Sequence, residues 1–331
     1  MRVLHITPHL GGGVGRVILD WVKAEGSGHV IMCLDTINSA ADSFCYEHQI
    51  PLLSKDEMPR VVDVLIEQAD TVVVHYWDHF TLPALLAQPF PPCRLVFWCH
   101  KNYPVSQAEI NYPDLFLGVS PVQGYKRHIR SVCDMTRFSE SAPQSHNGVI
   151  VGYVGTVDYK KLHADFLELC SAIKVPNIRF IIVGENNIGG VSDEKFTFTD
   201  HIDDVVPYYS IFDIFGYPLR PDHYGTCEQV LGEAMCAGVI PVVMDNPAER
   251  DIIKSVGYGI IAANKKEYVS AIEELAMYPR FRKSISEQIR GRAQAYYSLP
   301  RMRQQWARVF KTLGKHPKKE RIGLEIPEVQ S

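Results

Sequence analysis

The hydrophobic pattern divides the 331-residue chain into short apolar runs separated by mixed stretches. Such runs, rich in β-branched residues, predict buried strands. Mixed stretches of helical or loop character lie between the runs, and this alternation is typical of parallel sheets with crossover helices. A polar segment at 138–147 interrupts the pattern, which then restarts, so we expect an α/β protein with two domains. The predicted strands are 3–7, 30–34, 71–75, 94–99, 116–119, 149–154, 179–184, 212–217 and 239–244.

The segment 212–244 has the clearest boundaries, because it reads as strand, irregular loop, helix and strand. Thr226 and Gln229 have the spacing of a capping box, and Gly238 suits the left-handed residue that follows a helix. The first turn of a helix leaves backbone N–H groups unpaired at the positive end of its dipole. We therefore expect an anionic ligand to bind where this helix begins.

Two carboxylates on this helix have different explanations. Glu228 lies in the first turn, where a carboxylate also complements the helix dipole without any ligand. Glu233 precedes small apolar residues that suit packing on a sheet, so its carboxylate needs a hydrogen-bonding partner. Sugar hydroxyls donate well to carboxylates, so we expect Glu233 to bind a sugar or a ribose.

Composition excludes several classes of protein. The hydrophobic content of 46% and the charged content of 22% are ordinary globular values. No apolar run approaches the roughly 20 residues of a membrane helix, and no signal peptide opens the chain, so we expect a cytoplasmic protein. The eight cysteines show no C-x-x-C pair, which favours free thiols. A net charge of −4 argues against nucleic acid as a partner.

The run EAMCAGVIPVV at 233–243 resembles the signature of the retaining, nucleotide-sugar-dependent glycosyltransferases of family 4. The family's first glutamate of its E-x7-E pair falls on Gly225, so the pair is broken, and Glu228 is the nearest carboxylate. Whether Glu228 or Glu233 faces the sugar stays open. The resemblance implies the GT-B fold, which has two Rossmann-like domains facing a cleft and a C-terminal helix that crosses back to the first domain.

The domain boundaries follow from this resemblance and from the polar segment. We expect an acceptor-side N-terminal domain at 1–145 and a donor domain at 146–297. A helix at 298–315 should pack back on the N-terminal domain, and the charged segment 316–331 should be a flexible tail.

In the N-terminal domain the candidate residues follow two predicted strands. A glycine-rich loop at 11–15 precedes a predicted helix from about Arg16, but no third glycine completes a dinucleotide fingerprint. The family carries GG-x-E-R here, which implies that Gly12, Gly13 and Arg16 contact the donor. His100 resembles the family's histidine between donor sugar and acceptor, and His75 holds a similar strand-end position.

In the donor domain the family's G-R-x4-K-G motif aligns with Gly155 and Lys161, but Thr156 replaces the arginine and Leu162 replaces the last glycine. We expect Lys161 to act as a point charge on the leaving diphosphate. Arg220 and His223 are candidates for the missing cation. The resemblance adds further donor-binding residues, namely Gly184, Glu185, Gly225, Thr226 and Gln229 together with Glu228.

We therefore predict a retaining glycosyltransferase that moves a sugar from a UDP- or GDP-sugar to a glycan or glycolipid hydroxyl in bacterial surface glycan synthesis. The catalytic residues would be His100, Lys161 and Glu233, and no metal or other cofactor is required. The alternatives are a sugar-nucleotide epimerase, and a sugar-nucleotide-binding scaffold that has lost turnover. A basic predicted helix at 123–130 suits weak contact with an anionic membrane, although a solvated face explains it more simply.

Overall fold

The computed structural model describes residues 1–54, 58–101, 105–132, 134–141, 144–202, 204–223, 225–226 and 228–326, with only the backbone for 58–60, 123 and 228. The chain forms two compact units. Unit 1 comprises Met1–Cys133 and Leu299–Ser331, and unit 2 comprises Asp134–Ser298.

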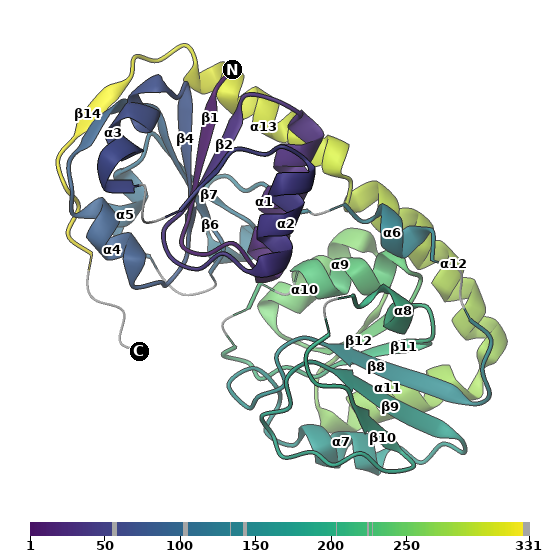
Figure 1. Ribbon diagram of the computed structural model, residues 1–331. Helices are drawn as coiled ribbons and strands as arrows, with labels where there is room; N and C mark the ends of the chain where they lie inside the picture. The colour runs from purple at the N-terminus through teal and green to yellow at the C-terminus, as the bar shows by residue number, and fades with distance from the viewer. Residues whose placement is uncertain are drawn as a thin grey trace. The chain divides into compact units, whose positions relative to one another are not determined.

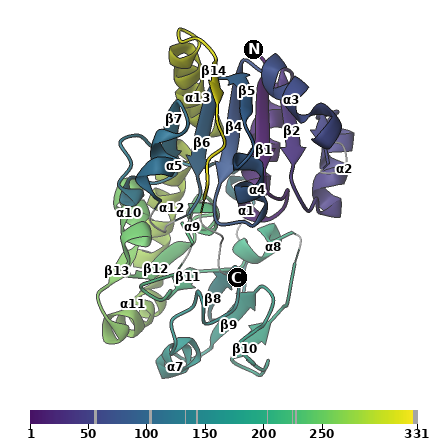
Figure 2. The same cartoon turned by 90° about the vertical axis from the view of Figure 1, so that its left-hand side faces the viewer.

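Unit 1 is built on a six-stranded parallel sheet in the order β3-β2-β1-β4-β6-β7, whose central strands lie side by side in Figure 2. The six strands of this sheet are β1 (Val3–Thr7), β2 (His29–Cys33), β3 (Leu52–Leu53), β4 (Thr71–Tyr76), β6 (Leu95–Cys99) and β7 (Leu115–Gly118). A separate two-stranded sheet contains β5 (Phe90–Cys93) and β14 (Lys319–Arg321). The helices are α1 (Gly12–Glu25), α2 (Ser39–Glu47), α3 (Met58–Gln68), α4 (Thr81–Leu86), α5 (Gln107–Asn111), the 3₁₀ turn Pro121–Gln123 and α13 (Leu299–Leu313).

Successive residues of each strand point to opposite faces of this sheet, so each face has its own contacts. Leu4 and Ile6 of β1 join a core that also includes Ile66 of α3 and Leu82 of α4. On the other face His5 packs edge-on against Trp21 of α1, with ring centroids 4.8 Å apart. Both faces are therefore covered, as a parallel sheet requires.

The C-terminal helix α13 packs on unit 1, which confirms the predicted return of the chain to the first domain. Trp306 is fully buried and stacks on Trp21, with ring centroids 4.7 Å apart. It also meets Trp98 of β6 at 5.1 Å. Arg303 adds an ion pair with Glu25 at the end of α1, with Nε 2.9 Å from Oε1.

The segment after α13 differs from the predicted flexible tail. Residues 319–321 form β14, which pairs antiparallel with β5, as Figure 2 shows. Arg321 and Asp114 form an ion pair at 2.6 Å, and both side chains are only 8% exposed. This buried ion pair and the strand hydrogen bonds hold residues 319–321 against unit 1. The polar composition of the segment did not indicate this pairing.

Unit 2 repeats the architecture with a second six-stranded parallel sheet, ordered β10-β9-β8-β11-β12-β13. Figure 1 labels its strands from β8 to β12. Its strands are β8 (Val149–Val154), β9 (Ile178–Val183), β10 (Phe196–Phe198), β11 (Ile214–Tyr217), β12 (Ile240–Met244) and β13 (Ile260–Ala262). Its helices are α6 (Thr136–Ser139), α7 (Phe166–Ala172), α8 (Val206–Tyr209), α9 (Glu228–Cys236), α10 (Pro247–Val256), α11 (Lys265–Met277) and α12 (Pro279–Tyr296).

The polar segment expected to link the domains lies in unit 2, so the units divide about a dozen residues earlier than the predicted boundary at 145/146. Phe138 of α6 is fully buried and packs edge-on against Tyr209 of α8. The Gln144 N–H donates to the Ser210 carbonyl at 2.8 Å. One buried aromatic ring thus anchors a segment whose composition resembles a linker.

Two predicted helix positions are also corrected. Helix α1 begins at Gly12, so the predicted loop glycines Gly13 and Gly15 lie inside it. The predicted basic helix at 123–130 does not form beyond the short 3₁₀ turn. Instead His128 bridges to Gly118 in a parallel sense, and the Trp98 indole N–H donates to the Ile129 carbonyl at 3.0 Å. The backbone N–H and C=O groups of this segment therefore form hydrogen bonds with β7 and with the buried indole, and not with one another as in a helix.

We expect Trp306→Ala to lower the free energy of unfolding by about 3–5 kcal/mol, because it removes a fully buried ring from the contact between α13 and the sheet. Urea titration followed by circular dichroism measures this change. Gln304→Ala, which alters an exposed position of the same helix, is the control and should stay within about 0.5 kcal/mol of wild type. An equal effect of both substitutions would contradict the docking role of Trp306.

Candidate functional site

The carboxyl ends of β8 and β9 in unit 2 meet through two glycines. Gly155 has φ 138° and Gly184 has φ 141°, values that side chains disfavour. A β-carbon on Gly184 would lie 2.0 Å from the Gly155 carbonyl oxygen, so the two backbones approach as closely as glycine permits. The next residues join the two loops, because the Asn187 N–H donates to the Val157 carbonyl at 2.9 Å. Glu185 lies exposed at this turn.

Lys161 places its ammonium group beside this junction. A β-carbon on Gly155 would lie 3.0 Å from Lys161 Nζ, so the glycine leaves space directly next to the charge. The ammonium lies 5.5 Å from the ring centroid of Tyr217, a buried residue at the end of β11. The structure thus brings together three predicted site residues, Gly155, Gly184 and Lys161, at the edge where parallel sheets bind ligands.

The loop after β11 approaches the same edge, because the Arg220 N–H donates to the Lys161 carbonyl at 3.1 Å. The Arg220 guanidinium is held by both carboxylate oxygens of Asp222, at 2.6 and 2.7 Å. Its Nη1 also donates to the Tyr159 carbonyl at 3.3 Å. Arg220 is therefore near Lys161 in the backbone, but its charge is already compensated by a carboxylate.

His223 is anchored by residues that the sequence analysis did not single out. The Gly225 N–H donates to His223 Nδ1 at 3.2 Å, which leaves Nε2–H to donate to Glu249 Oε2 at 3.1 Å. Asn246 donates to Glu249 Oε1 at 2.9 Å and to the carbonyls of Leu219 and Arg220 at 3.3 Å. Glu249 is fully buried. Asn246 and Glu249, at the start of α10, thus hold the loop that contains His223. Their spacing is that of a capping box, and this was the one feature of the sequence that could have pointed to them.

Glu233 projects from α9 into the interior and is 8% exposed. The Tyr209 hydroxyl donates to its Oε2 at 3.0 Å, so the sequence analysis correctly required a partner but did not identify this protein one. Burial, and then the charge of Glu233, raise the pKa of the Cys236 thiol to about 12. Gly238 takes the predicted left-handed conformation with φ 82°.

The remaining residues of this segment are only partly described. Helix α9 begins at Glu228, two residues after the predicted cap Thr226. The Glu228 side chain and residues 224 and 227 lie outside the described part of the structure. Gly225, Thr226 and Gln229 are partly exposed.

In unit 1, Gly12 and Gly13 form the start of α1 beyond the carboxyl end of β1, and Gly12 has φ 59°. Arg16 lies one turn later, and its guanidinium forms two contacts of 2.9 Å with the carboxylate of Asp20. Asp20 is 3% exposed, whereas Arg16 keeps 35% of its side chain exposed. Arg16 therefore compensates a buried carboxylate, a partner four residues away that the sequence analysis did not name.

His100 follows β6 at the carboxyl edge of the sheet in unit 1. Its Nε2 lies 3.2 Å from Nδ1 of His75, and burial lowers its pKa to about 3. Further polar residues gather at this edge: Lys101 pairs with Asp78 at 2.5 Å, and His79 lies 3.9 Å from Asp35. The structure places His100 in unit 1 and Lys161 and Glu233 in unit 2.

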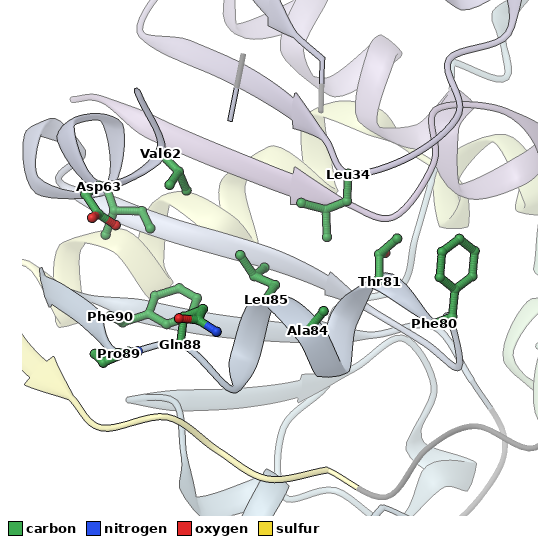
Figure 3. A pocket seen from close by; sticks show the side chains of 11 residues that line it. Leu34, Val62, Asp63, Phe80, Thr81, Ala84, Leu85, Gln88, Pro89 and Phe90 are labelled. Carbon is green, nitrogen blue, oxygen red and sulfur yellow. The ribbon is translucent and has the colours of Figure 1, made fainter. Parts of the chain in front are cut away.

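A separate apolar pocket of about 630 Å³ lies in unit 1 between α3, α4 and β5, where Figure 3 shows Leu85 and Ala84 of α4 facing Val62 and Leu34. It contains none of the predicted site residues. Its lining residues are Leu34, Val62, Asp63, Ile66, Phe80, Thr81, Ala84, Leu85, Gln88, Pro89 and Phe90.

Within the described residues, no group of three or more His, Cys, Asp or Glu side chains is arranged to hold a metal ion. None of the helices in this part of the chain combines the length and apolarity needed to cross a bilayer. The cysteines at 33, 45, 93, 99, 170 and 236 are free thiols, as predicted for them.

Comparison with known proteins assigns the class of unit 2. Residues 148–277 match the family model of the glycosyl transferases group 1. No curated protein sequence matches the chain. The family match confirms the predicted enzyme class, a glycosyltransferase, and the matched residues include the whole region from Gly155 to Glu249.

Solved structures match nearly the full chain at low sequence identity. Anabaena Alr3699/HepE in complex with UDP has a TM-score of 0.74 at 14% identity, covering 94% of this chain and 100% of that one. A glycosyltransferase from Rickettsia africae ESF-5 gives 0.73 at 13%, with 95% and 99% covered. WaaG, a glycosyltransferase involved in lipopolysaccharide biosynthesis, gives 0.65 at 14%, with 93% and 99% covered. These likenesses confirm the predicted GT-B fold class.

We expect Glu249→Ala to lower the free energy of unfolding by about 3 kcal/mol, because it leaves buried donors of His223 and Asn246 without their acceptor. Thermal and urea unfolding measure the loss. Lys254→Ala, on the exposed side of the same helix, should change stability by less than about 0.5 kcal/mol. A loss below about 1 kcal/mol for Glu249→Ala would show that the loop does not depend on this carboxylate.

Proposed function

We propose that the protein is a retaining glycosyltransferase that uses a UDP-sugar donor, and that the donor diphosphate binds at Lys161. The observation that carries the proposal is the ammonium group beside Gly155, at a position where a side chain would fill the space. An ammonium at the carboxyl edge of a parallel sheet is suited to a diphosphate. The relative Alr3699/HepE was solved with UDP and with UDP-glucose, which favours uridine over guanosine.

In this mechanism the diphosphate leaves while the acceptor hydroxyl attacks from the same face of the sugar. The bond from the anomeric carbon to the diphosphate oxygen breaks as the bond to the acceptor oxygen forms. Negative charge grows on the diphosphate, and Lys161 stabilises that charge more in the transition state than in the ground state. Its position is fixed in advance, so little reorganisation is needed during the reaction.

Glu233 is proposed to orient the sugar or ribose of the donor. Its carboxylate already accepts a hydrogen bond from Tyr209, which fixes its direction. His100 is proposed to contact the acceptor, since it follows β6 among polar residues of the carboxyl edge of unit 1. Glycan or glycolipid acceptors of bacterial surface glycans suit this proposal, and WaaG, a structural relative, acts in lipopolysaccharide biosynthesis.

We expect Lys161→Met to reduce kcat for sugar transfer by about 10²–10³-fold, because it removes the charge that faces the leaving diphosphate. Lys160→Met is the matched control, since this neighbouring lysine is exposed, and it should retain near wild-type activity. A transfer assay with UDP-glucose and a panel of sugar acceptors measures the rates. Equal activity of both variants would contradict the assignment of Lys161.

A thermal-shift series identifies the nucleotide separately from turnover. At 100 times its dissociation constant a ligand adds about 2.7 kcal/mol to the free energy of unfolding. We expect a shift with UDP or UDP-sugars that is larger than with GDP, ADP or TDP, and that is lost in Lys161→Met. No shift with any nucleotide would contradict the donor site, whereas binding without transfer would favour the scaffold alternative. A product of inverted anomeric configuration would contradict retention.

A further inference from the structure

Four histidines form a diagonal line across one face of the sheet in unit 1, namely His29 of β2, His5 of β1, His75 of β4 and His100 after β6. Each step moves one strand across and two residues along, and an offset of two keeps the side chains on the same face. The line runs from the first residue of β2 to the carboxyl end of β6. The register pairs that establish it are Val3 with His29, His5 with Val73, and His75 with Trp98.

Every link in the line joins Nδ1 of one imidazole to Nε2 of the next. His29 Nδ1 lies 2.8 Å from His5 Nε2, and His5 Nδ1 lies 3.1 Å from His75 Nε2. His75 Nδ1 lies 3.2 Å from His100 Nε2. Neighbouring rings are close to parallel, with interplanar angles of 30°, 25° and 19°. His5 and His75 are fully buried, and His5 packs against Trp21 while His75 packs against Trp98.

A neutral imidazole has one N–H donor and one acceptor nitrogen, so each link fixes the tautomers of both partners. If one ring carries its proton on Nε2, every ring in the line must do so, and the alternative is that all carry it on Nδ1. Burial keeps the rings neutral, because it lowers the pKa of His5 and His75 well below the usual value. Burial also lowers the pKa of His29 to about 4.

The two ends of the line lie in different surroundings. His29 lines a pocket of about 190 Å³ together with Lys23 and His48. The charge of Glu25 acts against burial and raises the pKa of His29, whereas Arg303 and the N-terminal amine lower it. At the other end, Nδ1 of His100 makes no hydrogen bond to the residues that the structure describes. The line therefore connects a pocket at one edge of the sheet with an available nitrogen at the other.

We propose that His29, His5, His75 and His100 form a tautomer relay, in which the ring at the pocket sets the form that His100 presents at the carboxyl edge. Of the two forms, we assign to the resting line the one with all four protons on Nε2, because His100 Nδ1 makes no hydrogen bond to the described residues and is the nitrogen at the carboxyl edge. His100 then presents Nδ1 as an acceptor. His5, His29 and His75 are positioning residues that act through His100.

The relay also balances a proton transfer, and this step rests on the proposed function. The acceptor hydroxyl loses its proton to His100 Nδ1 as its oxygen bonds to the anomeric carbon. Each ring passes its Nε2 proton to Nδ1 of the next, and His29 releases its Nε2 proton to water in the pocket. No ring becomes charged. The reverse shift resets the line when a proton enters at His29 and one leaves His100 Nδ1 for water.

Nitrogen NMR of the full chain labelled with ¹⁵N-histidine tests the relay without any substrate, because the shifts of protonated and unprotonated ring nitrogens differ. We expect the four rings to share the Nε2–H form in wild type. His5→Phe breaks two links and leaves the buried Nε2 of His75 without a partner, so the tautomers of His75 and His100 should shift away from Nε2–H. His48→Gln, in the same pocket but outside the line, should leave the His100 spectrum unchanged.

If His5→Phe does not fold, His29→Phe serves instead. It leaves the buried Nε2 of His5 without a partner, and since an orphaned N–H is rarer than an orphaned acceptor, the remaining rings should shift toward Nδ1–H. Mixed tautomers along the wild-type line, or an unchanged His100 spectrum in the folded variant, would overturn the relay. In the transfer assay, whichever of His5→Phe and His29→Phe folds should lose about tenfold or more in kcat with little change in KM. Absence of transfer in wild type would contradict the proposed function and leave the NMR result standing.

Discussion

Parallel strand pairing is the constraint on which the arrangement of both units depends. It brings the carboxyl ends of all six strands of a sheet to one edge, so residues far apart in the sequence become neighbours there. In unit 2 this edge joins Gly155 and Gly184, and it places the Lys161 ammonium beside them. In unit 1 the same pairing, with a constant offset of two residues, turns isolated histidines into a continuous hydrogen-bonded line.

Much of the fold could be predicted because its information is local. Buried strands are short runs of β-branched residues, and the strand, loop and helix around α9 are marked by turn and cap residues. The predicted start of α1, near Arg16, was wrong for a physical reason. Glycines carry no hydrophobic pattern, so the run from Gly11 to Gly15 reads as a loop. In the structure Gly15 lies inside the helix, where a β-carbon would come within 3.1 Å of the Leu10 backbone.

The partners within the candidate site could not be predicted, since each joins distant segments. Tyr209 reaches Glu233 across 24 residues, and His223 reaches Glu249 across 26. The sequence indicates that Glu233 needs a hydrogen-bonding partner and predicts a ligand in that place, but Tyr209 supplies one hydrogen bond. Likewise, nothing local distinguishes His5 from any other strand residue. Its role depends on strand order and register, which a single sequence does not specify.

The predicted break in the glutamate pair falls in a loop held by several hydrogen bonds. The resemblance puts the absent carboxylate at Gly225, and the N–H of this glycine donates to His223. His223 in turn donates to the fully buried Glu249, which also accepts from Asn246. A loop that had lost its function would not need to keep a buried carboxylate, because an unpaired one is strongly destabilising. Gly225 is therefore part of a loop organised around His223, and this order supports the proposed donor site over the scaffold alternative.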